Sequence, residues 1–76
     1  MNRFIIQAYN SPSPDSVFDV ESSLSKEKAF VKAGWFMCGV AHHVTIKDTK
    51  AEVGDINLWE VGYNEGLQIT QLGRRE

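Results

Sequence analysis

Cys38, His42 and His43 are the residues of this chain whose types and spacing most readily suggest chemistry. Thiolate and imidazole groups bind zinc, and a cysteine beside a histidine can also form a nucleophile–base pair. The same stretch could equally be the end of a helix that leads into a strand. Which of these it is largely decides the class of protein.

A metal site is not expected here. Gly39 is predicted to end the helix before Cys38 and His42 could align on one face. His42 and His43 are predicted to be neighbours on a strand, so that their side chains point to opposite faces. A closed zinc site needs about four ligands, and the sequence has no further Cys or His. We therefore predict no metal and no other cofactor, and we interpret Cys38 as a small buried hydrophobic residue.

A catalytic site is not expected either. A Cys–His pair needs an oxyanion-stabilising element inside a cleft that excludes water, and a domain of this size has little room for one. The sequence contains no GxSxG, GxGxxG or GxxxxGK[ST] motif and no EF-hand loop. We predict that the protein is not an enzyme.

Composition indicates one globular domain over residues 1–76, since 42% of the residues are hydrophobic. Ten acidic against eight Lys and Arg residues give a net charge of −2, which argues against a protein whose main task is to neutralise phosphates. The single cysteine and the lack of a long apolar run predict a cytoplasmic protein with no membrane segment.

Two strands open the chain. Residues 3–9 and 17–22 have the β-branched and aromatic content of strands, and the loop between them contains two prolines. This arrangement predicts a hairpin. Alternation in the second strand predicts that Phe18 and Val20 face the core.

One helix is predicted after this hairpin, with Ser25 as its N-cap and Gly39 directly after its end. Gly34 in the middle of a helix costs up to about 1 kcal/mol relative to alanine, so we expect a strand to pack closely against it. Helical periodicity predicts an apolar stripe that faces the core, made of Phe30, Val31, Ala33, Gly34, Met37 and Cys38.

Three further strands complete the chain. Residues 42–48 alternate, with Val44 and Ile46 on one face. Residues 56–72 contain two alternating runs around Asn-Glu-Gly, which predicts a hairpin with a type I turn closed by a left-handed glycine. Counting outward from that turn predicts these opposite pairs: Tyr63 and Leu67, Gly62 and Gln68, Val61 and Ile69, Glu60 and Thr70, Trp59 and Gln71.

The element order β-β-α-β-β-β predicts an α+β fold, in which a small antiparallel sheet has one amphipathic helix packed on one face. The other sheet face would be open to water or to a partner. An exposed edge strand can pair with a second copy unless charge or proline blocks it. Lys47 and the prolines after the first strand oppose such pairing, so we predict a monomer.

Candidate binding residues form two groups. On the helix, lysines could bind phosphate while the neighbouring aromatic rings stack on a base. Alternatively, these rings could border the core and the lysines could keep the helix soluble. Acidic and amide groups on the open sheet face could mimic phosphates. Trp and Tyr are enriched at protein interfaces, which favours a protein partner over nucleic acid. The candidates are Lys28, Lys32, Trp35 and Phe36 on the helix, and Glu60, Gln68 and Thr70 on the sheet.

The helix start "SLSKEKA" (residues 23–29), the strand that follows it and the terminal hairpin with "LWEVGYNEG" (residues 58–66) resemble the layout of small phage-encoded anti-CRISPR proteins. Those that act on type I effector complexes are the nearest. The resemblance covers most of the chain as architecture and transfers no contact residue. It implies a stoichiometric inhibitor that binds a large nucleoprotein complex and hides a surface from its target DNA. If the chain is phage-encoded, the predicted compartment is the cytoplasm of the host cell.

Two other functions stay open. The layout is also similar to that of small phage proteins that bind the host RNA polymerase, which implies a phage regulator. A direct nucleic-acid-binding domain is the alternative from a different class, and it would use the cations of the helix and of the C-terminus: Lys26, Lys28, Lys32, Arg74 and Arg75. We therefore predict a binder of a host protein or of a CRISPR effector complex, with direct nucleic-acid binding as the less favoured hypothesis.

Overall fold

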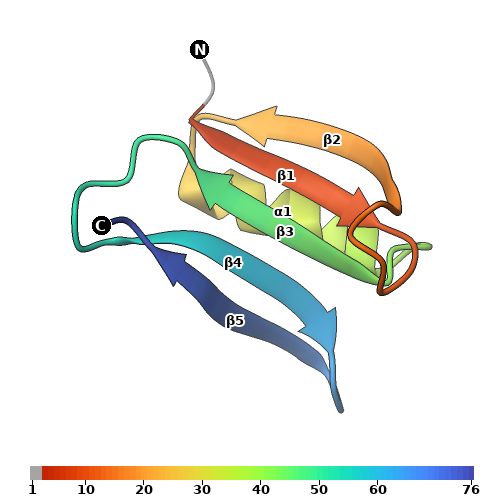
Figure 1. Cartoon of the computed structure of the whole chain (residues 1–76). Helices are drawn as coiled ribbons and strands as arrows, with labels where there is room; N and C mark the ends of the chain where they lie inside the picture. The colour runs from red at the N-terminus through yellow and green to blue at the C-terminus, as the bar shows by residue number, and fades with distance from the viewer. Residues whose placement is uncertain (1–2) are drawn as a thin grey trace.

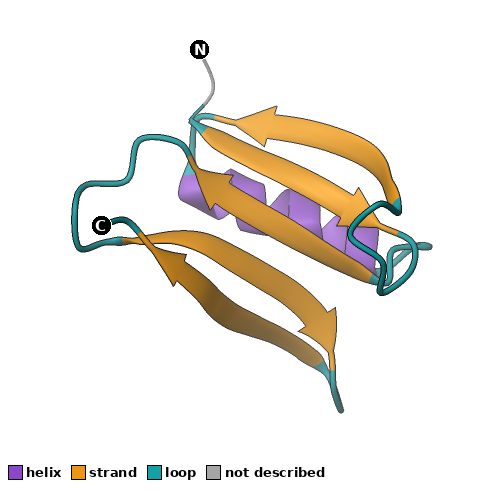
Figure 2. Cartoon of the chain, viewed as in Figure 1, coloured by secondary structure: helices purple, strands orange, loops and turns teal. Residues whose placement is uncertain are grey.

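Five strands and one helix form within residues 3–76, which are the residues described by this computed structural model. Neighbouring strands are antiparallel throughout, in the order β2-β1-β3-β4-β5, and the helix covers one face (Figures 1 and 2). The predicted α+β architecture is confirmed. Its elements are β1 (Phe4–Tyr9), β2 (Val17–Ser23), α1 (Lys26–Met37), β3 (His43–Asp48), β4 (Ile56–Tyr63) and β5 (Leu67–Arg74).

Two local hairpins, β1–β2 and β4–β5, are joined through β3, which pairs with β1 on one side and with β4 on the other. Helix α1 makes the connection between β2 and β3 and lies across the sheet face in doing so (Figure 1). Among the described elements it contacts β1 to β4 but not β5. One end of the sheet therefore extends beyond the cover of the helix.

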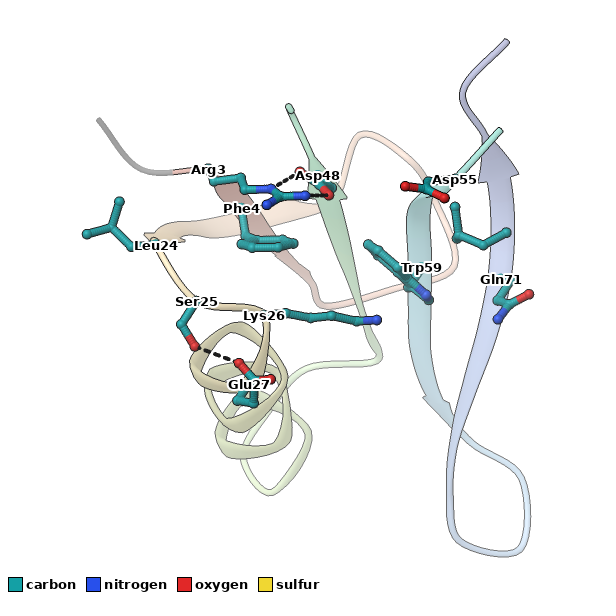
Figure 3. Close-up of a pocket in the computed structure, with 11 residues that line it drawn as sticks. Arg3, Phe4, Leu24, Ser25, Lys26, Glu27, Asp48, Asp55, Trp59 and Gln71 are labelled. Carbon is teal, nitrogen blue, oxygen red and sulfur yellow. Dashed lines mark hydrogen bonds and ion pairs between the residues drawn. The ribbon is translucent and has the colours of Figure 1, made fainter. Parts of the chain in front are cut away.

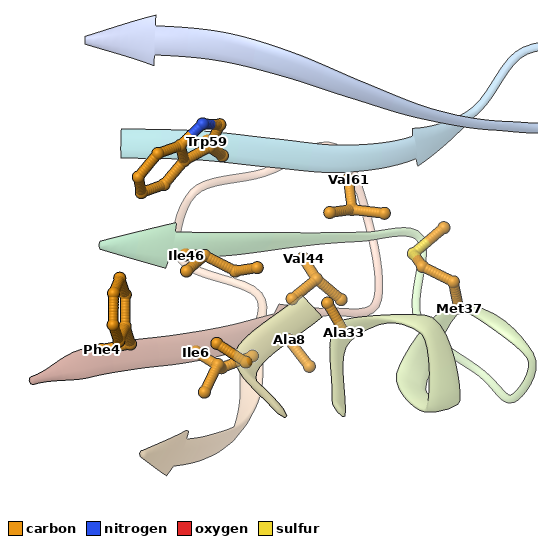
Figure 4. Close-up of a cluster of buried hydrophobic side chains, with 10 residues drawn as sticks. Phe4, Ile6, Ala8, Ala33, Met37, Val44, Ile46, Trp59 and Val61 are labelled. Carbon is orange, nitrogen blue, oxygen red and sulfur yellow. The ribbon is translucent and has the colours of Figure 1, made fainter. Parts of the chain in front are cut away.

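The core lies between α1 and the helix-facing side of the three central strands (Figure 4). Alternate residues of each strand point to this side, as the period of two requires. Ala29 and Ala33 bring no bulk to the helix, so its backbone lies close to the sheet. The buried cluster consists of Phe4, Ile6, Ala8, Ala29, Ala33, Met37, Val44, Ile46, Trp59 and Val61.

Both ends of α1 follow the prediction. The Ser25 side chain accepts a hydrogen bond of 3.2 Å from the backbone N–H of Lys28, which satisfies one of the free donors of the first turn. Cys38 is the C-cap, and Gly39 follows directly. Within residues 3–76 no helix is long and apolar enough to cross a membrane.

The predicted stripe of α1 is confirmed in part: Ala33 and Met37 are buried and Phe30 packs against the core, but two of its residues do not face the sheet. Ala29, Ala33 and Met37 are buried, whereas Val31 and Cys38 are exposed. The predicted stripe was centred on hydrophobic side chains, but the small alanines at a spacing of four residues determine which side can approach the sheet. The interpretation of Cys38 as a buried residue is therefore wrong.

The expectation of close packing at Gly34 is also wrong. No atom of another element lies within 4 Å of the position that a Cβ would occupy there. This glycine lies beside open space, so it is not explained by a strand that packs against the helix.

Strand β2 presents its acidic side chains to the helix, contrary to the prediction. Ile6 is paired with Glu21, which places Glu21 and Asp19 on the helix-facing side, while Val20 is exposed on the other. Phe18 lies beside a register irregularity in the β1–β2 ladder and is exposed as well, although its ring touches the helix. An edge strand that the helix only partly covers can carry carboxylates on its inner face, because they reach water.

All five predicted pairs of the β4–β5 hairpin are confirmed. The turn is closed by a hydrogen bond of 2.9 Å from the backbone N–H of Asn64 to the carbonyl of Gly66. Gly66 has a positive φ of 133°, as predicted, but Glu65 also has a positive φ of 61°. The turn is therefore not the predicted type I turn, in which only the glycine would be left-handed.

Candidate functional site

The predicted binding residues lie on two separate surfaces, one beside the helix and one on the open sheet face. Lys32, Trp35 and Phe36 come together around one pocket, and Lys28 does not line it. On the open face Glu60 is opposite Thr70, and Gln68 lies one pair nearer the turn on that side. The sheet separates the two groups, so they cannot form a single site.

The first surface is a pocket of about 350 Å³ between α1 and β2. We call it the Trp35 surface, and it is lined by Asp19, Glu21, Lys32, Trp35 and Phe36. Trp35 is 71% exposed, while Phe36 is half-buried. The ring of Phe36 meets that of Phe18 edge to face, with centroids 6.2 Å apart. Phe36 therefore anchors this side of the helix on β2, and Trp35 is left free to contact something else.

Charge on the Trp35 surface is net negative. The Lys32 ammonium lies 3.3 Å from a carboxylate oxygen of Glu21 and donates to the carbonyl of Ser22 at 3.2 Å. Asp19 supplies a second carboxylate, which accepts a hydrogen bond of 2.8 Å from the Val20 backbone. One ammonium thus faces two carboxylates, so this pocket does not favour a phosphate.

A second cluster on the open sheet face was missed by the sequence reasoning. The Tyr9 ring stacks on His43 with centroids 4.2 Å apart and planes 7° apart. Thr45 donates to the Tyr9 hydroxyl at 3.4 Å, and that hydroxyl donates to Gln7 at 3.2 Å. Thr45 is also opposite Glu60, one of the predicted residues. Only the β1–β3 pairing brings these groups together, and nothing local in the sequence indicates it.

His42 and His43 do not point apart, so the prediction that they diverge is wrong. Their Nδ1 atoms lie 3.0 Å apart, one ring edge-on to the other. Strand alternation does not apply to them because β3 begins only at His43. Burial lowers the pKa of His43, the neighbouring His42 lowers this pKa further, and Glu60 acts in the opposite direction. Within residues 3–76 no three His, Cys, Asp or Glu side chains gather in a group able to hold a metal ion.

Another pocket, about 520 Å³, lies between the first turn of α1 and the β4–β5 hairpin (Figure 3). Trp59 lines it and is 6% exposed. Phe30 packs edge to face on Trp59 at 5.7 Å, and the Lys26 ammonium lies 5.0 Å from the centre of the indole ring. Gln71, directly opposite Trp59 on β5, also lines this pocket. The sequence predicted that Trp59 and Gln71 are opposite each other, but it did not predict the pocket that they line.

An ion pair lines the same pocket. The Arg3 guanidinium binds both carboxylate oxygens of Asp48, at 2.7 and 2.8 Å (Figure 3). Asp48 is buried and also accepts a 3.0 Å hydrogen bond from the backbone N–H of Lys50. The hydrogen bond from Arg3 lowers the pKa of Asp48, against the effect of burial, and the same bond raises the pKa of Arg3. These two residues are 45 positions apart, and no sequence signal joins them.

Comparison with known proteins yields no relative for this chain: no family model, no curated protein and no solved structure matches it.

Proposed function

We propose that this chain is a non-enzymatic binding protein that recognises a protein partner through the Trp35 surface. The observation that carries this proposal is the exposure of Trp35: its side chain is 71% exposed and lines a pocket in which Phe36 already packs against β2. Large aromatic side chains next to a hollow are typical of the residues that dominate binding energy at protein interfaces. A domain of this size has few apolar side chains to bury, so leaving a tryptophan in water lowers its stability. A role in binding explains why this side chain is exposed.

The electrostatics of the surface support a protein partner over nucleic acid. Lys32 is paired with Glu21, and Asp19 adds a further negative charge. The other cations proposed for nucleic-acid binding do not join Lys32 in this pocket: Lys26 lies over Trp59, and Arg74 donates to the Gly54 carbonyl. A negative surface with an exposed indole is complementary to a basic protein groove.

Inhibition is the effect we propose for this binding. A basic groove that normally holds DNA is the kind of surface that the carboxylates of the Trp35 surface could occupy. The resemblance of the sequence layout to that of small anti-CRISPR proteins makes a type I effector complex the first partner to test, and the resemblance to small phage regulators makes the host RNA polymerase the second. Both are large assemblies that bind DNA, and blocking that binding requires no catalysis.

The test is displacement of target DNA. A purified type I effector complex is mixed with labelled target DNA and increasing amounts of the protein, and bound DNA is measured by fluorescence anisotropy. We expect stoichiometric loss of DNA binding, and at least tenfold weaker inhibition by Trp35→Ala, since a hot-spot residue contributes about 2 kcal/mol or more. Val40→Ala is the matched control, because Val40 is 80% exposed and does not line the Trp35 surface.

Two results would contradict the proposal. Equal inhibition by the wild-type protein and Trp35→Ala would remove the Trp35 surface from the interface. A gel shift of free DNA or RNA by micromolar protein, weakening linearly with salt on a log–log plot, would instead support direct nucleic-acid binding. If neither the effector complex nor the host RNA polymerase binds, inhibition of these two machines is excluded.

A further inference from the structure

The two edges of the sheet are β2 and β5 (Figure 1). The prediction of a monomer relied on Lys47 and on the prolines after the first strand. The prolines lie in the loop between β1 and β2, and Lys47 belongs to β3, which has a strand on both sides. Its charge therefore protects no edge. Whether this chain can pair with another strand depends on β2 and β5 alone.

These edges differ in how they are protected. Strand β2 carries Asp19 and Glu21 and has a register irregularity, two features that discourage pairing with a further strand. Strand β5 has no charged residue from Leu67 to Gly73 and no proline. Ile69, in its middle, is 59% exposed. An exposed edge strand whose residues Leu67–Gly73 carry no charge is a template for strand addition.

We infer that β5 pairs antiparallel with β5 of a second copy, to form a two-fold symmetric dimer with a continuous ten-stranded sheet. The charges at the two ends of the strand support a second copy as the occupant. Glu65 lies in the turn before β5, and Arg74 and Arg75 lie at its other end. Antiparallel pairing brings the acidic end of one strand beside the basic end of the other, and symmetry makes this contact twice.

The two-fold axis restricts the register. A two-fold axis perpendicular to the sheet keeps the helices of both copies on the same side of the sheet. Each helix-facing residue of one β5 is therefore opposite a helix-facing residue of the other β5. Of the dyad positions that this allows, Ile69 and Thr70 are the ones that bring Glu65 to the basic end of the other strand, opposite Gly73 or Arg75. In either register Arg74 lies opposite a residue adjacent to Glu65, and no like charges meet along the strand. On the helix-facing side, Ile69 lies opposite Ile69 of the second copy in the first register and diagonal to it in the second.

The dimer leaves the Trp35 surface free. That surface lies between α1 and β2, at the opposite edge of the sheet from β5. The dimer would therefore present two Trp35 surfaces at its outer ends. This inference does not rest on the proposed function, since it uses no residue of the Trp35 surface.

Sedimentation equilibrium over a range of protein concentrations tests the dimer. We expect the mass to rise from the 8.6 kDa of one chain to twice that value. Ile69→Lys should weaken association at least tenfold, because it places two ammonium groups beside the dyad in either register. Val40→Lys is the matched control and should associate like the wild-type protein, since Val40 is exposed and lies outside the sheet. Circular dichroism confirms that each variant is folded.

Charge reversal gives a second, independent measurement. Glu65→Arg alone should weaken the dimer, because arginines then face arginines, and Glu65→Arg combined with Arg74→Glu should restore most of the association. A wild-type mass of one chain at millimolar concentration overturns the inference. It is also overturned if a dimer forms but neither Ile69→Lys nor Glu65→Arg weakens it, because the copies would then meet elsewhere.

Discussion

Trp35 and Trp59 lie on opposite flanks of the same helix, and their environments are opposite. Trp59 is 6% exposed, with Phe30 packed edge to face on its indole. Trp35 is 71% exposed and is covered by no other aromatic ring that the structure describes. Each has a lysine nearby, but Lys26 lies over the ring of Trp59, whereas Lys32 is engaged by Glu21.

The difference between the two flanks comes from the sheet beneath them. On the Trp59 flank a further strand, β5, lies beyond β4. The pocket beside Trp59 is therefore bounded by the start of α1 on one side and by Gln71 of β5 on the other. On the Trp35 flank the sheet ends at β2, whose inner face carries carboxylates instead of apolar side chains. The same residue type thus contributes to the core on one flank and to a surface on the other. Variants at the two flanks should separate stability from binding.

Trp59→Ala should have the largest effect on stability. It removes a buried indole from the core cluster and leaves a cavity, which costs about 3–5 kcal/mol for a residue of this size. Urea unfolding followed by circular dichroism measures the loss, and Trp59→Phe should recover much of it because an aromatic partner for Phe30 is retained. A loss below about 1 kcal/mol would show that Trp59 is not part of the core.

Asp48→Asn should be second, because it breaks the ion pair with Arg3 on the Trp59 flank. We expect a loss of about 1–2 kcal/mol at neutral pH, at the lower end for a charged hydrogen bond because Arg3 is half exposed. The pKa of Asp48 is lowered in the folded state, so its contribution is complete above the ordinary carboxyl pKa of about 4 and is lost as the pH falls through the lowered value.

Thermal unfolding between neutral pH and strongly acidic pH measures this dependence. The melting temperature of the wild-type protein should fall on acidification more steeply than that of Asp48→Asn, which has no proton to bind at this position. Parallel curves for the two proteins would mean that the Arg3–Asp48 pair contributes nothing to folding.

Local patterns account for most of the fold. The Ser25 cap, the alternation of Val44 and Ile46 and the positive φ of Gly66 each depend on residues close in sequence, and these predictions are confirmed. The predicted type I turn before Gly66 is wrong, because Glu65 also has a positive φ. The hairpin register followed because turn geometry and hydrophobic alternation agree there. Where a single local signal had to decide, as for Val20 and Cys38, the prediction failed.

The candidate sites were predicted less well than the fold, because they depend on pairings between distant residues. Trp35 and Lys32 were identified from the helix alone, but the carboxylates of β2 that reverse the charge of their pocket depend on the β1–β2 register. The stacking of Tyr9 on His43 and the binding of Arg3 to Asp48 depend on how β1 and β3 are aligned. Composition and periodicity carry no information about such alignment.

Gly34→Ala should have a smaller effect, and one of opposite sign. Nothing lies within 4 Å of the added methyl group, and the backbone of Gly34 is helical. Alanine should therefore stabilise the protein by up to about 1 kcal/mol, through helix propensity and a less flexible unfolded chain. Urea unfolding measures the gain. A loss would show that the space beside Gly34 is occupied in solution, for example by a second copy.

Trp35→Ala should have the smallest effect on stability, within about 0.5 kcal/mol, because truncating an exposed side chain removes little burial. Acrylamide quenching of fluorescence makes the comparison direct. In Trp59→Phe the only indole is Trp35, which should be quenched strongly, whereas in Trp35→Phe the remaining indole, Trp59, should be shielded. Equal quenching of the two would remove the distinction between the flanks. If Trp35→Ala unfolds the protein as readily as Trp59→Ala does, then Trp35 is held by the fold itself, and its exposure no longer supports a binding role.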